Sequence, residues 1–102
     1  MEYNKLVRDK IPSLMEAQGK NPQTRVLSQE EYIRCLEGKL DEEVAEFHAD
    51  HTPEELVDIL EVVLALAEDM GCSGEDLLRI YEKKHEARGG FRDRIFLIRD
   101  DS

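Results

Sequence analysis

The sequence predicts an all-α fold, an antiparallel bundle of about four helices in a single domain of 102 residues. Two observations support this prediction. Residues 28–31 and 52–55 each place Ser or Thr three positions before Glu, a pattern typical of a helix N-terminus. Apolar residues then recur at helical spacing after both signals. We therefore expect the second and third helices to form a neighbouring antiparallel pair.

Each predicted helix begins near a Pro, Ser or Thr and is followed by a turn or a Gly. The expected ranges are 12–18, 28 to about 49, 53 to about 70, and 74 to about 87 or 88. Two short segments have strand-like character, residues 24–27 and 94–98, and the second is a candidate partner for the first. The third helix is apolar around most of its circumference, which predicts burial on more than one side.

The composition excludes several classes of partner. Lys and Arg total 14 against 24 Asp and Glu, and the net charge of −10 disfavours binding to nucleic-acid polymers. No apolar run is long enough to cross a bilayer, so we expect no membrane contact. The first ten residues lack the apolar core of a signal peptide. Cys35 and Cys72 lack metal-ligand spacing, which predicts free thiols and a cytoplasmic location.

Two acidic groups occupy the expected helix pair: Glu42-Glu43-x-x-Glu46 and Glu55-x-x-Asp58. Residues three apart share a helix surface, and both groups lie on flanks of the same rotational sense. An antiparallel pair brings such flanks to one groove, and converging carboxylates are what a hard divalent cation requires. The alternative is a solvated acidic flank, since Asp and Glu are abundant throughout the chain.

Cationic side chains are candidates for phosphate binding at two places. Lys84 and Arg88 continue an inward-looking stripe at the end of the fourth helix, next to Gly89-Gly90. Arg8 and Lys10 belong to a basic cluster near the N-terminus. Snorkelling at a helix end and ordinary surface exposure are the alternatives for these side chains.

The sequence resembles the MazG-like all-α nucleoside triphosphate pyrophosphohydrolases, which include phosphoribosyl-ATP pyrophosphohydrolase. The acidic motifs carry this resemblance, as E-E-x-x-E at residues 42–46 and E-x-x-D at residues 55–58. The chain is closest to a subgroup of small single-domain members. In that subgroup an opening like YNKLVRDKIP, residues 3–12, is combined with an ending like RGGF, residues 88–91.

The resemblance implies Mg²⁺ bound by the acidic motifs, with Mn²⁺ able to replace it. It implies hydrolysis of a nucleotide substrate to the monophosphate and pyrophosphate, by a homodimer formed through the long helices. Pairing of dimers into tetramers is left open. By position, the implied metal ligands are Glu42, Glu43, Glu46, Glu55 and Asp58. Glu46 or Glu43 is the expected acceptor of the proton from the attacking water.

Clearance of unwanted nucleotides is favoured over histidine synthesis, because the chain ends differ from those expected of the histidine enzyme. Glu61, three residues past Asp58, is a further candidate ligand. The competing hypothesis is a non-catalytic acidic helical dimer that acts as a binding or adaptor module through its apolar third helix. That hypothesis predicts neither Mg²⁺-dependent stabilisation nor nucleotide turnover.

Overall fold

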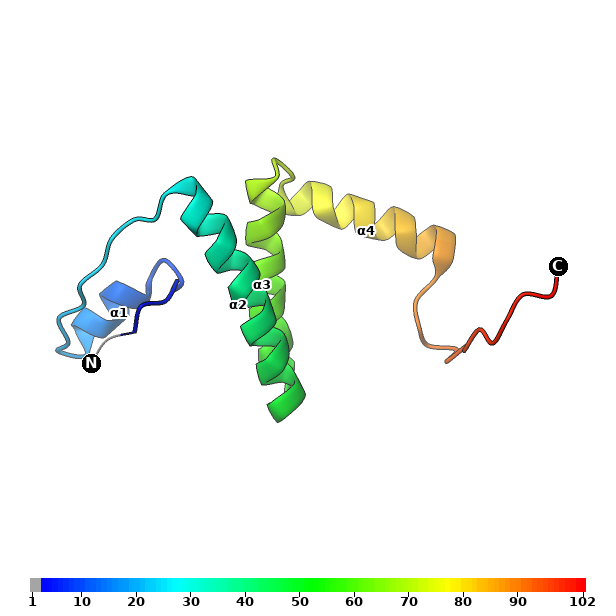
Figure 1. Ribbon diagram of the computed structural model, residues 1–102, viewed down its shortest axis with the longest axis horizontal. Helices are drawn as coiled ribbons and strands as arrows, with labels where there is room; N and C mark the ends of the chain where they lie inside the picture. Colours follow the sequence, from blue (N-terminus) through cyan, green and yellow to red (C-terminus); the bar gives the residue numbers. More distant parts are fainter. Residues whose placement is uncertain (1–2) are drawn as a thin grey trace.

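The computed structural model describes residues 3–102, and this part of the chain is all-α with four helices (Figure 1). The helices are α1 (Ile11–Ala17), α2 (Gln29–Asp50), α3 (Pro53–Asp69) and α4 (Gly74–Arg88). The predicted all-α class, helix number and order are therefore confirmed, with boundaries that agree to about one residue. The capping signals account for this accuracy, because they act within a few residues of each helix start.

Helices α2 and α3 form an antiparallel hairpin, the central unit in Figure 1. Only His51 and Thr52 separate them. His51 takes a left-handed conformation (φ 52°), and its N–H donates to the carbonyl of Phe47 at 2.8 Å. Thr52 is extended and caps α3. This two-residue connection fixes the register of α3 against α2, and so the relative position of the two acidic motifs.

The buried apolar core lies in this hairpin and is small. Among residues 3–102 the buried apolar side chains are Leu36 from α2 and Val62 and Ala67 from α3. On α3, Leu56, Val57 and Leu60 remain about half exposed. Helix α3 is therefore buried on its α2 side while another apolar side is open. None of the helices in the described residues combines the length and apolar character needed to cross a membrane.

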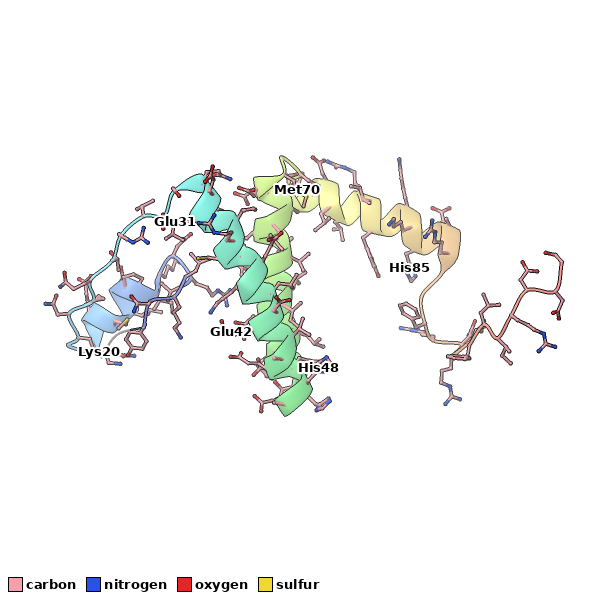
Figure 2. All side chains as sticks on the ribbon, viewed as in Figure 1. Lys20, Glu31, Glu42, His48, Met70 and His85 are labelled. Carbon is pink, nitrogen blue, oxygen red and sulfur yellow. The ribbon has the colours of Figure 1, made fainter. Side chains whose placement is uncertain are left out.

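Helix α4 leaves the hairpin at the end opposite the His51–Thr52 turn and runs away from it (Figure 1). Met70, at the junction, marks this end in Figure 2. Near the start of α4 the chain packs closely on α3, since a Cβ placed on Gly74 would lie 3.6 Å from a methyl of Leu64. The remainder of α4 is exposed from Leu78 onward.

The two predicted strands are wrong, because neither segment pairs with another strand in the described residues. Residues 24–27 belong to an irregular connection in which Val26 is 96% exposed. Residues 94–98 begin with a left-handed Arg94 (φ 56°) whose N–H closes a turn to Phe91. A strand needs hydrogen bonds from a neighbouring strand, which local residue preferences cannot provide.

Candidate metal centre

The predicted carboxylates gather near the turn end of the hairpin. One oxygen from each of Glu42, Glu43 and Glu46 lies within 4.8 Å of the others. Glu43, Glu55 and Asp58 form a second such group across the two helices. Glu43 belongs to both groups and joins the α2 motif to the α3 motif. We call the five carboxylates the acidic cluster.

Glu43 is the centre of the acidic cluster. It is the buried charged residue of the described chain, with 7% of its surface exposed. Its Oε2 atom is buried and has no hydrogen-bond partner in residues 3–102. Burial raises the pKa of Glu43, and the adjacent carboxylate of Glu46 raises this pKa further. A buried acceptor without a partner is costly, and a bound cation would satisfy it.

Glu55 provides the corresponding carboxylate on α3. Its backbone N–H donates to Thr52 Oγ1 at 3.4 Å, so Thr52 caps the helix as predicted. The Glu55 carboxylate does not complete the capping box, and its buried Oε2 also lacks a partner within residues 3–102. Burial and the facing carboxylate of Asp50 raise the pKa of Glu55. Glu55 is thus held in the acidic cluster without a compensating donor on that oxygen.

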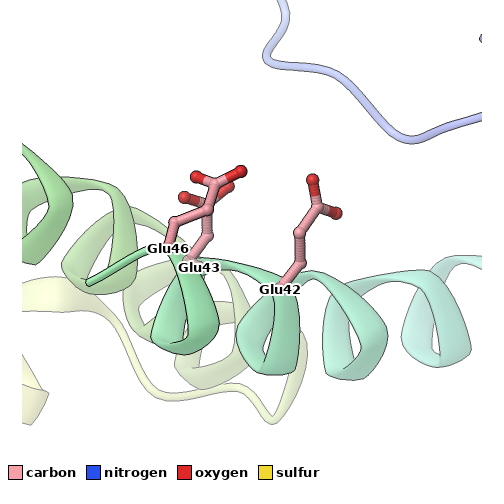
Figure 3. A group of neighbouring side chains, drawn as sticks. All are labelled: Glu42, Glu43 and Glu46. Carbon is pink, nitrogen blue, oxygen red and sulfur yellow. The ribbon is translucent and has the colours of Figure 1, made fainter. Parts of the chain in front are cut away.

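Glu42 and Glu46 are the exposed members of the cluster. Figure 3 shows Glu43 and Glu46 close together, whereas Glu42 stands farther along α2 on the same side of the helix. The spacing explains this arrangement, because Glu46 is three positions from Glu43 and four from Glu42, and both spacings share a helix face. Glu46 therefore combines contact with Glu43 and access to solvent.

Lys39 partly neutralises the α2 carboxylates. Its Nζ lies 3.8 Å from Glu43 Oε1 and 3.7 Å from Glu42 Oε2. Sequence reasoning did not assign Lys39 a role, although its spacing of four residues from Glu43 was a signal for an ion pair. Sequence reasoning also gave no role to Asp50, whose carboxylate lies near that of Glu55 because the turn between the helices is tight.

Arg8 reaches the cluster from the N-terminal segment. Its guanidinium lies 3.5 Å from Asp58 Oδ1 and 3.6 Å from Glu61 Oε2. The segment carrying Arg8 closes one side of a pocket of about 180 Å³, whose other walls include Lys39, Glu43 and Asp58. Arg8 therefore lies at the acidic cluster, paired with carboxylates, and its predicted role in phosphate binding stays a prediction. Glu61 pairs with Arg8 and is absent from the two close carboxylate groups.

The other predicted cations are not brought to the cluster within one chain. Lys10 is exposed just before α1 and has no ion pair among residues 3–102. Lys84 and Arg88 are exposed near the far end of α4. Figure 2 shows His85, in this part of α4, well separated from Glu42 on the hairpin. Arg88 instead borders an open pocket between α4 and the residues that follow it.

Glu42 and Glu46 are exposed, as on a solvated acidic flank, and the cluster differs from such a flank at Glu43 and Glu55. A solvated carboxylate keeps its hydrogen bonds to water, whereas Glu43 and Glu55 each have a buried oxygen without a partner in the described chain. Five carboxylates face two contacting cations, Lys39 and Arg8, so negative charge remains in excess. Several carboxylate oxygens in excess of local positive charge suit Mg²⁺ or Mn²⁺.

The comparisons with known proteins give one partial match. An uncharacterized protein of Mycolicibacterium smegmatis is 55% identical to this chain over 47 residues. The match covers 46% of this chain and 48% of that relative, so it spans about half of each protein. No protein-family model matches the chain. No solved structure matches it.

Proposed function

We propose that this protein is a Mg²⁺-dependent nucleotide pyrophosphohydrolase that removes unwanted nucleotides from the cell's pool. It would convert a nucleoside triphosphate, or a related nucleotide, to the monophosphate and pyrophosphate. The observation that carries the proposal is the buried Glu43 carboxylate, which is shared by two carboxylate groups and has an unpartnered oxygen. The resemblance of the two acidic motifs to those of MazG-like enzymes supplies the reaction.

The residues present fit a divalent cation. Glu43, Glu55 and Asp58 would hold it between the helices, and Glu46 and Glu42 would complete the oxygen set from the exposed side of α2. Bound Mg²⁺, or Mn²⁺ in its place, neutralises phosphate oxygens and makes a water more acidic. Burial, followed by neighbouring carboxylates, raises the pKa values of Glu43 and Glu55, and a bound cation would favour their charged forms.

The chain's own groups have separate tasks in this reaction. One water is added across the anhydride between the first and second phosphates, so the products are the monophosphate and pyrophosphate. Glu46 is exposed beside Glu43 and accepts the proton from that water. Arg8 orients Asp58, and Lys39 orients Glu43, because each cation is within ion-pair distance of that carboxylate.

We also propose that the protein acts as a homodimer with α3 in the interface. A chain of this size buries little apolar surface by itself, and Leu56, Val57 and Leu60 leave an apolar side of α3 open. A second copy would cover that side. The free thiols of Cys35 and Cys72 favour a reducing compartment such as the cytoplasm.

The test is pyrophosphate release from a panel of nucleoside triphosphates, with and without Mg²⁺. We expect Mg²⁺-dependent release from at least one nucleotide, and its loss in Glu43→Gln and Asp58→Asn. Glu37→Gln is the matched control, because Glu37 is an exposed glutamate of α2 outside the cluster. Circular dichroism should show that all three variants keep their helices. Absence of release from every nucleotide would favour the adaptor hypothesis, and full activity of Glu43→Gln would refute the site.

A further inference from the structure

Charge is divided unevenly along the chain. The α2–α3 hairpin, residues 29–69, holds fourteen Asp or Glu residues against two Lys or Arg, a net charge of −12. Residues 74–102 hold seven Lys or Arg and seven Asp or Glu, but within them residues 88–99 hold four Arg against one Asp, a net charge of +3. Half of the chain's cations therefore lie in this C-terminal region. Opposite charges on two surfaces favour and orient their association.

The acidic cluster has few cations of its own for a phosphate chain. Lys39 and Arg8, the two that contact it, are already paired with cluster carboxylates. The basic end of α4 is directed away from the hairpin of the same chain (Figures 1 and 2). A triphosphate carries negative charge beyond what a cation at the carboxylates neutralises, so further donors are required. The chain contains further cationic side chains, but those of α4 and the residues after it do not lie at the acidic cluster of the same chain.

The segment after α4 is apolar as well as basic. We call residues 88–99 the C-terminal arm. Phe91 is 98% exposed, and the four residues Ile95–Ile98 are each 80–87% exposed. Between these apolar residues and α4 lies an open space of about 670 Å³, bordered by Arg88, Arg92 and Arg94. A contiguous exposed apolar segment of this kind marks an interaction surface.

We propose that the C-terminal arm binds the α2–α3 hairpin of a second copy of this chain. Its apolar residues cover the open side of α3, and Arg88, Arg92 and Arg94 contact the phosphates at that copy's acidic cluster. The substrate site is then composite, with carboxylates from one protomer and arginines from its partner. The part of this inference that concerns phosphates rests on the proposed function, whereas the exchange of arms does not.

The geometry of the hairpin is suited to this exchange. The acidic cluster lies toward the turn end, whereas α4 departs from the other end (Figure 1). A two-fold axis perpendicular to the hairpin places the departure end of one copy beside the turn end of the other. Each copy then offers its arm to the partner's cluster, as an isologous dimer requires. An arm of this length extends up to about 40 Å, which exceeds the roughly 33 Å length of a 22-residue helix such as α2.

A photo-crosslinking experiment tests arm exchange without reference to activity. Phe91 is replaced by p-benzoylphenylalanine, and copies with natural and ¹⁵N isotopes are mixed and irradiated. Mass spectrometry of the products should give peptides in which an arm of one isotope is joined to residues 29–69 of the other. Crosslinks confined to one isotope would mean that the arm folds back on its own hairpin. Absence of crosslinks, with a monomer in solution, would equally overturn the proposal.

Subunit complementation tests the composite site. Glu43→Gln lacks a working cluster, and Arg92→Gln/Arg94→Gln lacks arm cations, so each alone should lose most activity. Random mixing makes half of the dimers mixed, each with one intact site, and should restore about a quarter of wild-type activity. Lys20→Gln/Arg34→Gln is the control, because it removes the same charge from exposed positions outside the arm. It should keep full activity when tested alone.

The outcomes separate the two proposals. Mixed-isotope crosslinks from a protein that hydrolyses no nucleotide would support the arm and reject the enzyme. An active enzyme without mixed-isotope crosslinks, or without recovery on mixing, would reject the arm and keep the enzyme. Full activity of Arg92→Gln/Arg94→Gln alone would show that these two arm arginines do not bind phosphates.

Discussion

Two helix starts in this protein share the same local pattern and use it differently. Ser28 and Glu31 begin α2, and Thr52 and Glu55 begin α3. At the first start the Ser28 N–H donates to Glu31 Oε1 at 3.1 Å, and the Glu31 N–H donates to Ser28 Oγ at 3.3 Å. The capping box is complete at this position, and both of its donors are satisfied.

Arg25 completes the environment of Glu31. Its two terminal nitrogens lie 3.2 Å and 2.9 Å from the two Glu31 carboxylate oxygens. The hydrogen bond from Arg25, followed by the contacts with Ser28, lowers the pKa of Glu31 to about 2. Glu31 is thus a carboxylate whose charged form is stabilised by the chain itself.

At the second start only half of the pattern is used. Thr52 accepts the Glu55 N–H, but the Glu55 carboxylate lies in the acidic cluster with a raised pKa. The comparison shows that a local motif sets where the helix begins, whereas tertiary neighbours decide what the glutamate does. Glu31 faces an arginine, and Glu55 faces other carboxylates across a tight turn.

Removal of each carboxylate in turn tests whether Glu31 and Glu55 differ in function. Glu55→Gln should reduce Mg²⁺-dependent pyrophosphate release by about 100-fold, because it removes a predicted metal ligand. Glu31→Gln should leave the rate within about twofold, because Glu31 lies at the other end of α2. Steady-state assays at saturating Mg²⁺ measure both effects. Equal losses in the two variants would mean that the glutamates do not differ in function.

The same two substitutions should change metal-free stability in opposite directions. Glu55→Gln removes a partly buried charge that lacks a donor, so the Tm should rise by a few degrees. Glu31→Gln removes a carboxylate that accepts from Arg25 and Ser28, so the Tm should fall by a few degrees. Thermal unfolding with a chelator present provides the measurement. Two shifts of the same sign would contradict the assigned environments.

The pH dependence of stability should also differ between the cluster glutamates and Glu31. The raised pKa values of Glu43 and Glu55 mean that the folded metal-free chain binds more protons than the unfolded chain. Their contribution is present below the ordinary carboxyl pKa and is lost as pH rises through the raised values. The Glu31 contribution has the opposite sign, and it is lost as pH falls through about 2.

Unfolding scans between about pH 5 and pH 8 with a chelator lie above the range in which the Glu31 contribution changes, and comparison with Glu43→Gln isolates the effect of Glu43. The wild-type Tm should fall more steeply with rising pH than the Tm of Glu43→Gln. Excess Mg²⁺ should flatten the wild-type profile, because the cation stabilises the charged carboxylates. Identical profiles for wild type and Glu43→Gln would rule out the raised pKa of Glu43.

The smallest expected difference concerns the caps themselves. Ser28→Ala should reduce the free energy of unfolding by about 1 kcal/mol, since it removes a reciprocated cap. Thr52→Ala should have a smaller effect, because its hydrogen bond is longer and Glu55 does not reciprocate it. Urea titration of the two variants provides the comparison. A larger loss from Thr52→Ala would indicate that Glu55 completes the second capping box after all.

The successes and failures of sequence prediction have one physical origin. Helix starts were predictable because Ser28 and Thr52 act on groups three residues away. Convergence of Glu43 with Asp58 was also predictable, since both lie on flanks of the same rotational sense in an antiparallel pair. The strand at residues 94–98 was predicted wrongly, because pairing depends on a distant partner that the residues themselves do not specify.

For the cationic side chains, too, local contacts could be predicted from the sequence and distant ones could not. Lys39 acts on Glu43 through local spacing and could have been predicted. The contact of Arg8 with Asp58 spans 50 residues, and the sequence identified Arg8 only as part of a basic cluster, without its partner. The direction of α4 is not encoded in its periodicity. Helical spacing placed Lys84 and Arg88 on one stripe, but it could not show that α4 carries this stripe away from the hairpin of the same chain.

Metal binding itself gives the most direct test of the account. Mn²⁺ would be titrated into metal-free protein, and the electron paramagnetic resonance signal of free Mn²⁺ recorded. We predict saturable binding to wild type and equally to Glu31→Gln, with affinity at least about tenfold weaker in Glu43→Gln. If wild type binds no Mn²⁺, or if Glu43→Gln binds it as tightly as wild type, the acidic cluster is not a metal centre.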